Sequence, residues 1–119
     1  MPALIRTRRV SLSAMALLTL LASVALAEQS IIEEGRQIAF DRKKGNCLSC
    51  HAIEGGDMPG NIGPPLLAMQ SRFPDASKLK AQISDARTAN PDTIMPPFGP
   101  NQILTDAEID KVVAFIHSL

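Results

Sequence analysis

The sequence Gly45-Asn46-Cys47-Leu48-Ser49-Cys50-His51 decides how this chain folds. It contains the pattern Cys-x-x-Cys-His, in which two thiols are three residues apart and an imidazole directly follows the second thiol. On one tight turn, both thiols can reach the two vinyl groups of a single porphyrin, and the histidine then lies beside the iron. This pattern is the attachment signature of c-type haem. It predicts one covalently bound haem, with thioether bonds to Cys47 and Cys50 and with His51 as the proximal iron ligand.

Two other uses of a Cys-x-x-Cys pair fit this sequence less well. A dithiol or disulfide redox pair normally follows a strand of a βαβ unit, and no alternating apolar pattern precedes Cys47. A structural zinc site needs four ligands, and the chain has two cysteines and two histidines in all. The second histidine, His117, falls in the last turn of a predicted helix. A surface position or an interaction with the helix dipole is expected there, and iron ligation is a remoter alternative.

The proximal histidine needs a hydrogen-bond partner for its second ring nitrogen, because such a partner sets the tautomer and the ring orientation. Pro64 has no N–H, but its carbonyl oxygen is free to accept a hydrogen bond. Pro64 is therefore the predicted partner of His51. The alternative is that Gly63-Pro64 forms only a turn.

Three methionines after residue 27 are candidates for the distal iron ligand. Met95 precedes two prolines, which hold it in an extended conformation on a loop that can cross the opposite face of the porphyrin. Met58 would have to wrap round the porphyrin edge within seven residues of His51. Met69 lies on a predicted helix, where core packing is more typical. Met95 is the predicted ligand, and such His/Met ligation favours electron transfer over the binding of small ligands.

The first 27 residues have the pattern of a signal peptide. Three arginines come first, Val10–Ala27 contains no charged residue, and the segment ends in the small-x-small sequence Ala25-Leu26-Ala27. We expect cleavage after Ala27 and export to the periplasm, which leaves residues 28–119 as a monohaem domain with no membrane span. The alternative is an uncleaved anchor, because the apolar run is nearly long enough to span a bilayer.

Charge and composition exclude some classes of partner. The leader holds three of the 12 basic residues and none of the 12 acidic ones, so the remaining chain has a net charge of −3. It has no basic patch with interleaved aromatic residues, so nucleic acid is not an expected partner. The chain has no Trp and no Tyr. A small domain with so few large apolar groups usually needs an additional stabilising link, and a covalent haem would supply one.

Apolar spacing predicts an all-helical domain with two long loops. The first helix, over 30–41, contains Gly35, which indicates close approach by another helix. Asp75 is a predicted N-cap, and Thr105-Asp106-Ala107-Glu108 fits a capping box. The other helices are expected over residues 66–72, over about three turns from Ala76 to Ala86, and from the capping box to the chain end, with Ile109, Val112, Val113 and Ile116 buried.

The two long loops, residues 53–65 and 88–102, are rich in glycine and proline. Long loops within a compact domain usually have a function. Here each loop is expected to cover one side of the haem.

The motif order resembles that of the class I cytochromes c. It consists of Cys-x-x-Cys-His, then Gly63-Pro64, then Met95-Pro96, between a helix that contains Gly35 and an apolar last helix. The resemblance covers the whole of 28–119. It implies an all-α class I cytochrome c fold, with the first and last helices crossing near Gly35. It also implies the same roles for the Pro64 carbonyl and the Met95 sulfur.

Two longer stretches, Gly45–Leu66 and Asn90–Gly99 followed by Ile103-Leu104-Thr105, resemble SoxX more specifically. SoxX is the small cytochrome subunit of the SoxAX complex of thiosulfate oxidation. This resemblance implies a periplasmic heterodimer with a SoxA-type cytochrome, and transient contacts with a sulfur carrier protein and a downstream electron acceptor. The complex acts as an L-cysteine S-thiosulfotransferase, which joins thiosulfate oxidatively to a cysteine of the carrier.

The two cysteines limit what this chain contributes. If haem uses both Cys47 and Cys50, no thiol is left to attack sulfur. The chain would then be the non-thiol, electron-accepting subunit, with no catalytic site of its own, and the sulfur chemistry would occur on the partner. Ile62 and Leu66 are expected on the docking surface, with cover of the haem as the alternative.

Two rival functions share the haem and the fold. One is a free-standing electron carrier, although the charges near the motif are mixed in sign, whereas carriers often show a charged ring for steering. The other is a ligand-binding or sensor cytochrome with a weak distal ligand.

Overall fold

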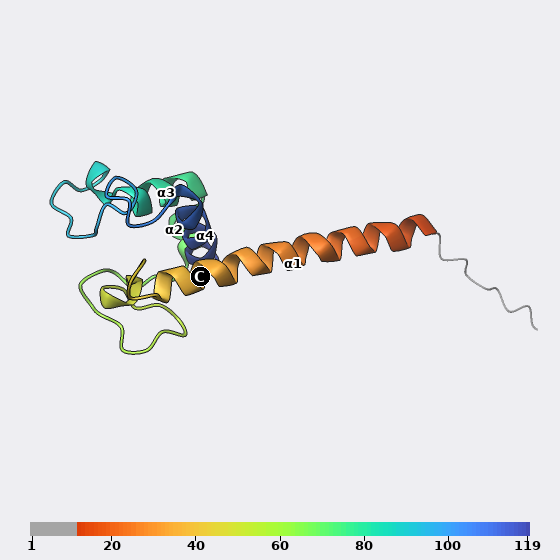
Figure 1. The fold of residues 1–119 in the computed structure, drawn as a ribbon, viewed down its shortest axis with the longest axis horizontal. Helices are drawn as coiled ribbons and strands as arrows, with labels where there is room; N and C mark the ends of the chain where they lie inside the picture. The colour runs from red at the N-terminus through yellow and green to blue at the C-terminus, as the bar shows by residue number, and fades with distance from the viewer. Residues whose placement is uncertain (1–11) are drawn as a thin grey trace, which may run out of the picture.

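The computed structural model describes residues 12–119, with side chains from Met15 onward. The three arginines at the start of the predicted signal peptide lie outside the described residues. Within 12–119 every regular element is helical, and this agrees with the expected all-α fold (Figure 1). The elements in chain order are α1 (Leu12–Phe40), η1 (Cys47–Ser49), α2 (Met69–Arg72), α3 (Ala76–Ser84), η2 (Ala86–Thr88) and α4 (Asp106–His117), where η denotes a 3-10 turn.

Helices α1 and α4 form the most extensive contact between elements, and they pack closely at Gly35. A Cβ atom added to Gly35 would overlap the carbonyl group of Lys111 and would lie 3.0 Å from Cβ of Phe115. Next to this contact, the rings of Phe40 and Phe115 pack edge to face with centroids 5.8 Å apart. The prediction that the first and last helices cross near Gly35 is confirmed.

Helix α4 begins at the predicted capping box. The Thr105 hydroxyl accepts a hydrogen bond from the Glu108 N–H, and the Glu108 carboxylate accepts one from the Thr105 N–H at 2.9 Å. The apolar side chains then recur at helical spacing on one face and are buried. This face consists of Ile109, Val112, Val113, Phe115 and Ile116.

Helix α3 begins after the predicted cap, since the Asp75 carboxylate accepts a hydrogen bond from the Ser77 N–H at 2.9 Å. It ends at Ser84 because Asp85 is extended, with φ −151° and ψ 91°. Ala86, which was predicted to share the apolar face of this helix, lies instead in the separate turn η2. The side chain is nevertheless fully buried.

The short helix expected over 66–72 is shorter than predicted. It starts only at Met69, because Ala68 has a left-handed backbone with φ 51° that interrupts helical geometry. Before that point the chain is held by the Leu66 N–H, which donates to the Ala52 carbonyl at 2.9 Å.

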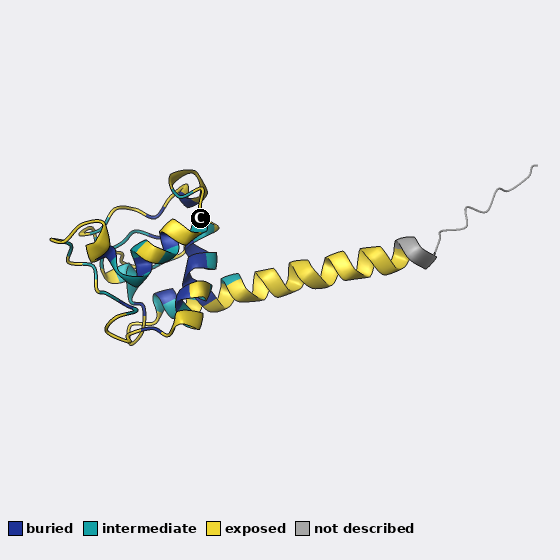
Figure 2. Cartoon of the chain, turned by 90° about the horizontal axis from the view of Figure 1, so that it is seen from above, coloured by how far each residue is buried: buried dark blue, intermediate teal, exposed yellow. Residues whose placement is uncertain are grey.

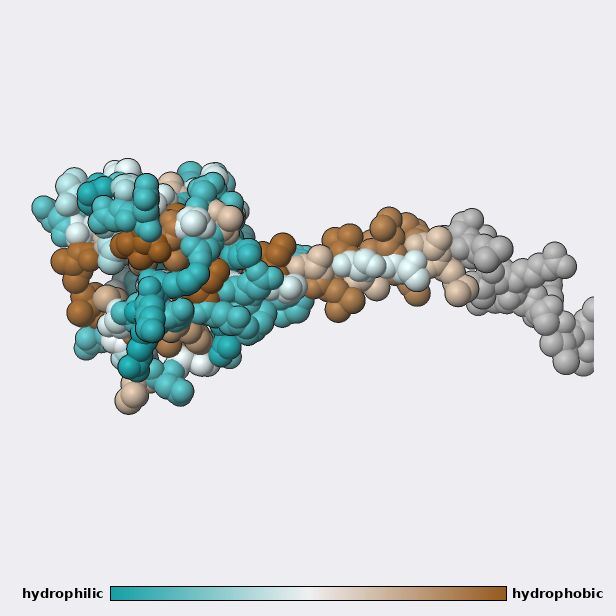
Figure 3. All heavy atoms as spheres, viewed as in Figure 1, coloured by the Kyte–Doolittle hydropathy of each residue, from teal (hydrophilic) through white to brown (hydrophobic). Residues whose placement is uncertain are grey.

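Helix α1 is longer than the helix expected over 30–41, because it continues back through the leader without a break at Ala27 (Figure 1). Residues 12–34 are rich in alanine and leucine, which are strong helix formers, and contain no glycine or proline. The part from Met15 to Phe40 is long and apolar enough to cross a membrane, and its most apolar window is not buried against the domain. Figure 3 shows these apolar side chains on the surface of the projecting helix.

The hydrophobic core lies where α1, α3 and α4 meet and is closed by side chains from the loops (Figure 2). Leu79 and Ile83 come from α3, and they face the buried side of α4. The loops add Ile53, Leu66, Phe98 and Leu104. The core therefore forms the inner wall of the large cavity described below.

Candidate haem site

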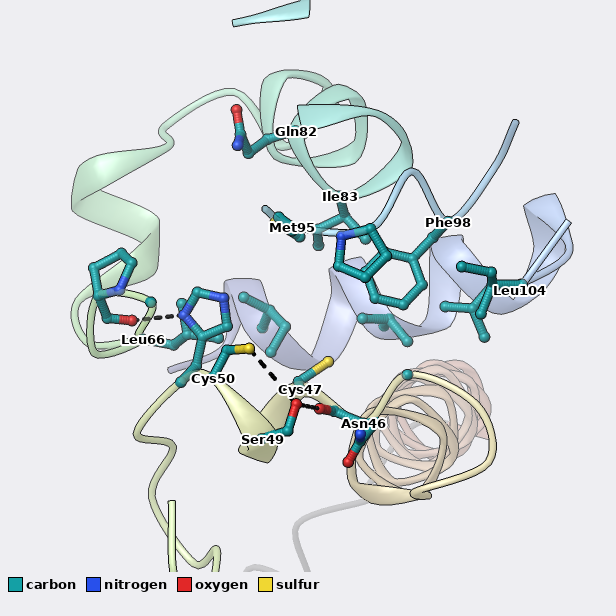
Figure 4. Close-up of a pocket in the computed structure, with 18 of the residues that line it drawn as sticks. Asn46, Cys47, Ser49, Cys50, Leu66, Gln82, Ile83, Met95, Phe98 and Leu104 are labelled. Atoms are coloured by element: carbon teal, nitrogen blue, oxygen red, sulfur yellow. Dashed lines mark hydrogen bonds between the residues drawn. The ribbon is translucent and has the colours of Figure 1, made fainter. Parts of the chain in front are cut away.

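A cavity of about 540 Å³ opens beside the core. Its lining comes from the Cys-x-x-Cys-His turn, residues 62–66, α2, α3, residues 93–98, residues 103–104 and α4. Most of its walls are apolar side chains, and its size and apolar character are typical of a cofactor site. Figure 4 shows the turn that carries the cysteines on one side of the cavity, and Met95 with Ile83 on the other.

The Cys-x-x-Cys-His segment forms one compact turn. The His51 N–H donates to the Cys47 carbonyl at 2.9 Å, and the Ser49 hydroxyl donates to the Asn46 carbonyl at 2.8 Å. Both Cys47 and Cys50 are free thiols that line the cavity. Burial raises the pKa of the Cys47 thiol to about 11, so in the unmodified chain this thiol is protonated at neutral pH.

His51 is oriented by the loop that follows it. Its Nδ1 lies 2.7 Å from the Pro64 carbonyl oxygen. A carbonyl can only accept, so Nδ1 carries the proton and Nε2 keeps a free lone pair. Gly63 makes this approach possible, because an added Cβ there would overlap the His51 ring. The Gly63 N–H also donates to the Cys50 carbonyl at 2.8 Å, which ties the loop to the turn.

The three candidate methionines have different environments. Met95 is half-buried and lines the cavity, and its N–H donates to the Thr93 hydroxyl at 3.2 Å. Met69 also lines the cavity, but it is 2% exposed within the core, and its sulfur accepts from the Arg72 guanidinium at 3.3 Å. Met58 is 86% exposed and does not belong to the cavity lining. Met95 is thus the methionine that faces the cavity without another polar partner for its sulfur among the described residues.

His117 lies outside this cavity. Its Nε2 is 2.9 Å from the Phe73 carbonyl oxygen, so it links the end of α4 to the segment after α2. This contact accounts for His117 as a structural group, outside the cavity that Cys47, Cys50 and His51 line.

The residues present fit a covalent haem. Two thiols on one turn, an imidazole with a free Nε2 and a thioether across the cavity are the groups that c-type attachment and His/Met ligation require. The apolar walls suit a porphyrin. Gly63 lacks the Cβ that would overlap the imidazole, so the His51 ring has room beside this loop.

Two features of the site differ from the sequence-based expectation or were missed by it. Leu66 was expected on a docking surface, but it is 9% exposed and belongs to the core, so that expectation is wrong, whereas Ile62 is 65% exposed at the cavity rim. Gln82 of α3 and Thr93 line the cavity and had not been predicted there. The only available signal for Gln82 was its position next to the apolar Ile83, which did not show which side of α3 faces a cofactor.

Residues 32–119 match the family model described as cytochrome c. This chain belongs to the cytochrome c family. Membership implies a covalently bound haem and an electron-transfer function, and it agrees with the all-helical fold. The structure also resembles a chain in the crystal structure of SoxXA from P. pantotrophus, with a TM-score of 0.65 and 28% identity, over 72% of this chain and 79% of that chain. The expected resemblance to SoxX is therefore confirmed.

The chain is also similar to a curated protein described as an uncharacterized lipoprotein of Aquifex aeolicus (strain VF5). It is 34% identical over 76 residues, which are 63% of this chain. The match spans 37% of the length of that relative. An N-terminal apolar helix and a lipoprotein relative are compatible with an exported protein.

Proposed function

We propose that this cytochrome carries one haem in the periplasm and is the electron-transfer subunit of a SoxAX-type complex. The observation that carries the proposal is the likeness to SoxXA, which extends over 79% of that chain at 28% identity. The SoxX-like stretches of the sequence, Gly45–Leu66 and Asn90–Gly99, contribute to the walls of the same cavity.

In this proposal each group at the cavity has one role. Cys47 and Cys50 would hold the haem through two thioether bonds, and the His51 Nε2 and the Met95 sulfur would ligate its iron. Pro64 accepts from Nδ1, which keeps the ring oriented and more basic. The bound haem would supply a one-electron couple between ferrous and ferric iron.

The chain's share in the reaction follows from its cysteine content. The proposed complex forms an S–S bond between thiosulfate and a cysteine thiol of a carrier protein, and this step releases one proton and two electrons. The whole chain has two cysteines, and both line the haem cavity. Bond formation therefore takes place on the SoxA-type partner, and this subunit receives the electrons and passes them to a downstream acceptor. The thiosulfotransferase activity belongs to the complex.

Location follows from the leader. Cleavage after Ala27 would remove the most apolar part of α1 and leave the periplasmic domain 28–119. Every described core residue, and every described side chain packed against the core, lies at or after Ile32, so the described part of the leader contributes nothing to the core.

Purification of the native complex tests the proposal. The exported protein, tagged through a flexible linker after Leu119, is isolated at high ionic strength from cells grown on thiosulfate. We expect a second haem-containing subunit at equal stoichiometry, and thiosulfate-dependent reduction of this haem when the purified pair is supplied with the reduced carrier protein. A Cys47→Ser, Cys50→Ser double variant is the control for haem-dependent folding. A lone monomeric cytochrome would contradict the proposal and support the free-standing carrier.

A further inference from the structure

The haem cavity has one polar side chain that nothing in the fold or the ligand set uses, namely Gln82. It is half-buried on α3 and lines the cavity. Among the described residues its amide has no hydrogen-bond partner. Figure 4 shows it on the α3 wall, across the cavity from Cys47 and Cys50. An amide on a cavity wall with no protein partner is available to donate to a group of a bound cofactor.

The chemistry of haem says which group comes to this wall. The vinyl groups and the two propionate groups stand on opposite halves of the porphyrin ring. Because Cys47 and Cys50 would hold the vinyl half, the propionate half would extend toward the wall across the cavity. A carboxylate that leaves water needs hydrogen-bond donors there, and the chain has no tryptophan or tyrosine side chain to supply one.

Other polar side chains of the lining are less suited to this role. Arg42, Lys43, Lys44, Asn46 and Ser49 belong to the segment that carries the cysteines. Nη1 of Arg72 donates to the Pro65 carbonyl at 2.9 Å and to the Met69 sulfur at 3.3 Å, which holds this guanidinium beside the loop that carries Pro64 rather than on the α3 wall. The Thr93 hydroxyl accepts from the Met95 N–H.

We propose that the side-chain amide of Gln82 donates a hydrogen bond to a haem propionate and thereby positions the porphyrin edge opposite the thioethers. This inference rests on the proposed haem attachment at Cys47 and Cys50. Gln82 touches the carboxylate and not the iron, so it acts on the cofactor through the charge of that carboxylate.

A hydrogen bond to the propionate alters how the reduction potential depends on pH. Ferric haem carries one more positive charge than ferrous haem, so an ionised propionate stabilises the oxidised form, and the potential falls as pH rises through the propionate pKa. A donor favours the ionised carboxylate and lowers that pKa. Gln82→Leu removes the donor and should move the pH-dependent fall upward by about one pH unit, which is about tenfold in the ionisation constant. Gln82→Arg adds a charged donor and should move the fall downward.

The test is a spectroelectrochemical titration of the holoprotein from pH 4 to pH 10. Wild type, Gln82→Leu, Gln82→Arg and the exposed control Gln70→Leu are compared, and we expect the pH midpoint to rise in the order Arg, wild type, Leu. Gln70 lies on α2 and does not line this cavity, so its variant should match wild type. Identical profiles for all four proteins, including four flat ones, overturn the role of Gln82. A c-type haem spectrum of the wild type is recorded first, so that failed haem attachment is seen separately from failure of this inference.

Discussion

At the residue scale, the site depends on atoms whose chemistry is set by their neighbours. The carbonyl of Pro64 fixes the proton of His51 on Nδ1 at a distance of 2.7 Å, and Gly63 leaves the room for that contact. Met95 differs from Met69 because the sulfur of Met69 already accepts from Arg72. The choice of distal ligand therefore rests on which sulfur is free to face the cavity.

The assignment of Met95 leads to the first prediction. Met95→His should lower the reduction potential, because a histidine pair stabilises ferric haem more than His/Met ligation does. It should also abolish the absorption band that arises from the sulfur-to-iron bond. Optical spectra and redox titration of the purified holoprotein measure both effects. Met58→His is the matched control, since Met58 is exposed outside the cavity; persistence of the sulfur band in Met95→His would assign the ligand to another methionine.

At the element scale, the two terminal helices carry the fold, and Glu108 ties the start of α4 to the segment that follows α1. Its carboxylate closes the capping box and also contacts the Lys44 ammonium. The hydrogen bond from Lys44, followed by those from Thr105, lowers the pKa of Glu108 to about 2 from its ordinary value of 4.5. One side chain thus joins the start of α4 to the segment that precedes the haem motif.

The lowered pKa predicts how stability depends on pH. A carboxylate whose pKa is lower in the folded state stabilises the fold above its unfolded pKa, and this contribution is lost as pH falls through the folded value. Wild type should therefore be more stable than Glu108→Gln at pH 6, and the difference should shrink between about pH 4.5 and about pH 2. Urea unfolding at several pH values measures it. Glu54→Gln, a change of an exposed acid with no ion pair among the described residues, should show no such trend; a constant difference for Glu108→Gln would refute the coupling.

The contact between α1 and α4 at Gly35 predicts a change in stability that is opposite to the one expected from helix propensity. Gly35→Ala should favour an isolated helix by about 1 kcal/mol, but the added Cβ would overlap the Lys111 carbonyl group. We expect a net loss of about 1–3 kcal/mol in the free energy of unfolding, because helix packing must shift. Denaturant unfolding of the holoprotein gives the value. Ser30→Ala on the exposed side of the same helix should be near neutral, and stabilisation by Gly35→Ala would show that the helices do not pack at this glycine.

At the scale of the whole molecule, a long helix with an exposed apolar segment precedes a domain built around the cavity. Among the described side chains, the apolar core lies entirely at or after Ile32, while the side chains from Met15 to Leu26 are exposed. No described side chain before residue 28 therefore contributes to the core. The helix is continuous across Ala27 because its residues favour helix.

Leader removal is the prediction at this scale. The intact mass of the exported protein should equal that of residues 28–119 plus one haem, and the protein should remain in the soluble periplasmic fraction. Mass spectrometry with cell fractionation measures this. Ala25→Phe should block cleavage because the site requires a small side chain at that position, and its product should sediment with membranes. A full-length wild-type protein in the membrane fraction would establish the leader as an anchor.

The sequence by itself determined the groups that are bonded locally. Cys47, Cys50 and His51 lie within one turn, and capping by Asp75 and Thr105 depends on atoms at most three residues apart, so short-range geometry was enough to predict them. Gly35 within a helix predicted close approach by another helix, and the resemblance to cytochromes c identified that helix as the last one. The resemblance to cytochromes c then supplied the arrangement of these parts.

Only the tertiary structure decided which distant side chains share the cavity. Leu66 is buried in the core, and Ala86 lies in a turn separate from α3. Gln82 lines the cavity because α3 packs its Leu79 and Ile83 face against α4. Each outcome depends on where two segments far apart in the sequence meet, and the apolar pattern of one helix does not specify its partner. Hence the chemistry of the Cys-x-x-Cys-His turn could be predicted from neighbouring residues, whereas the residues on the opposite walls of the cavity depend on tertiary packing.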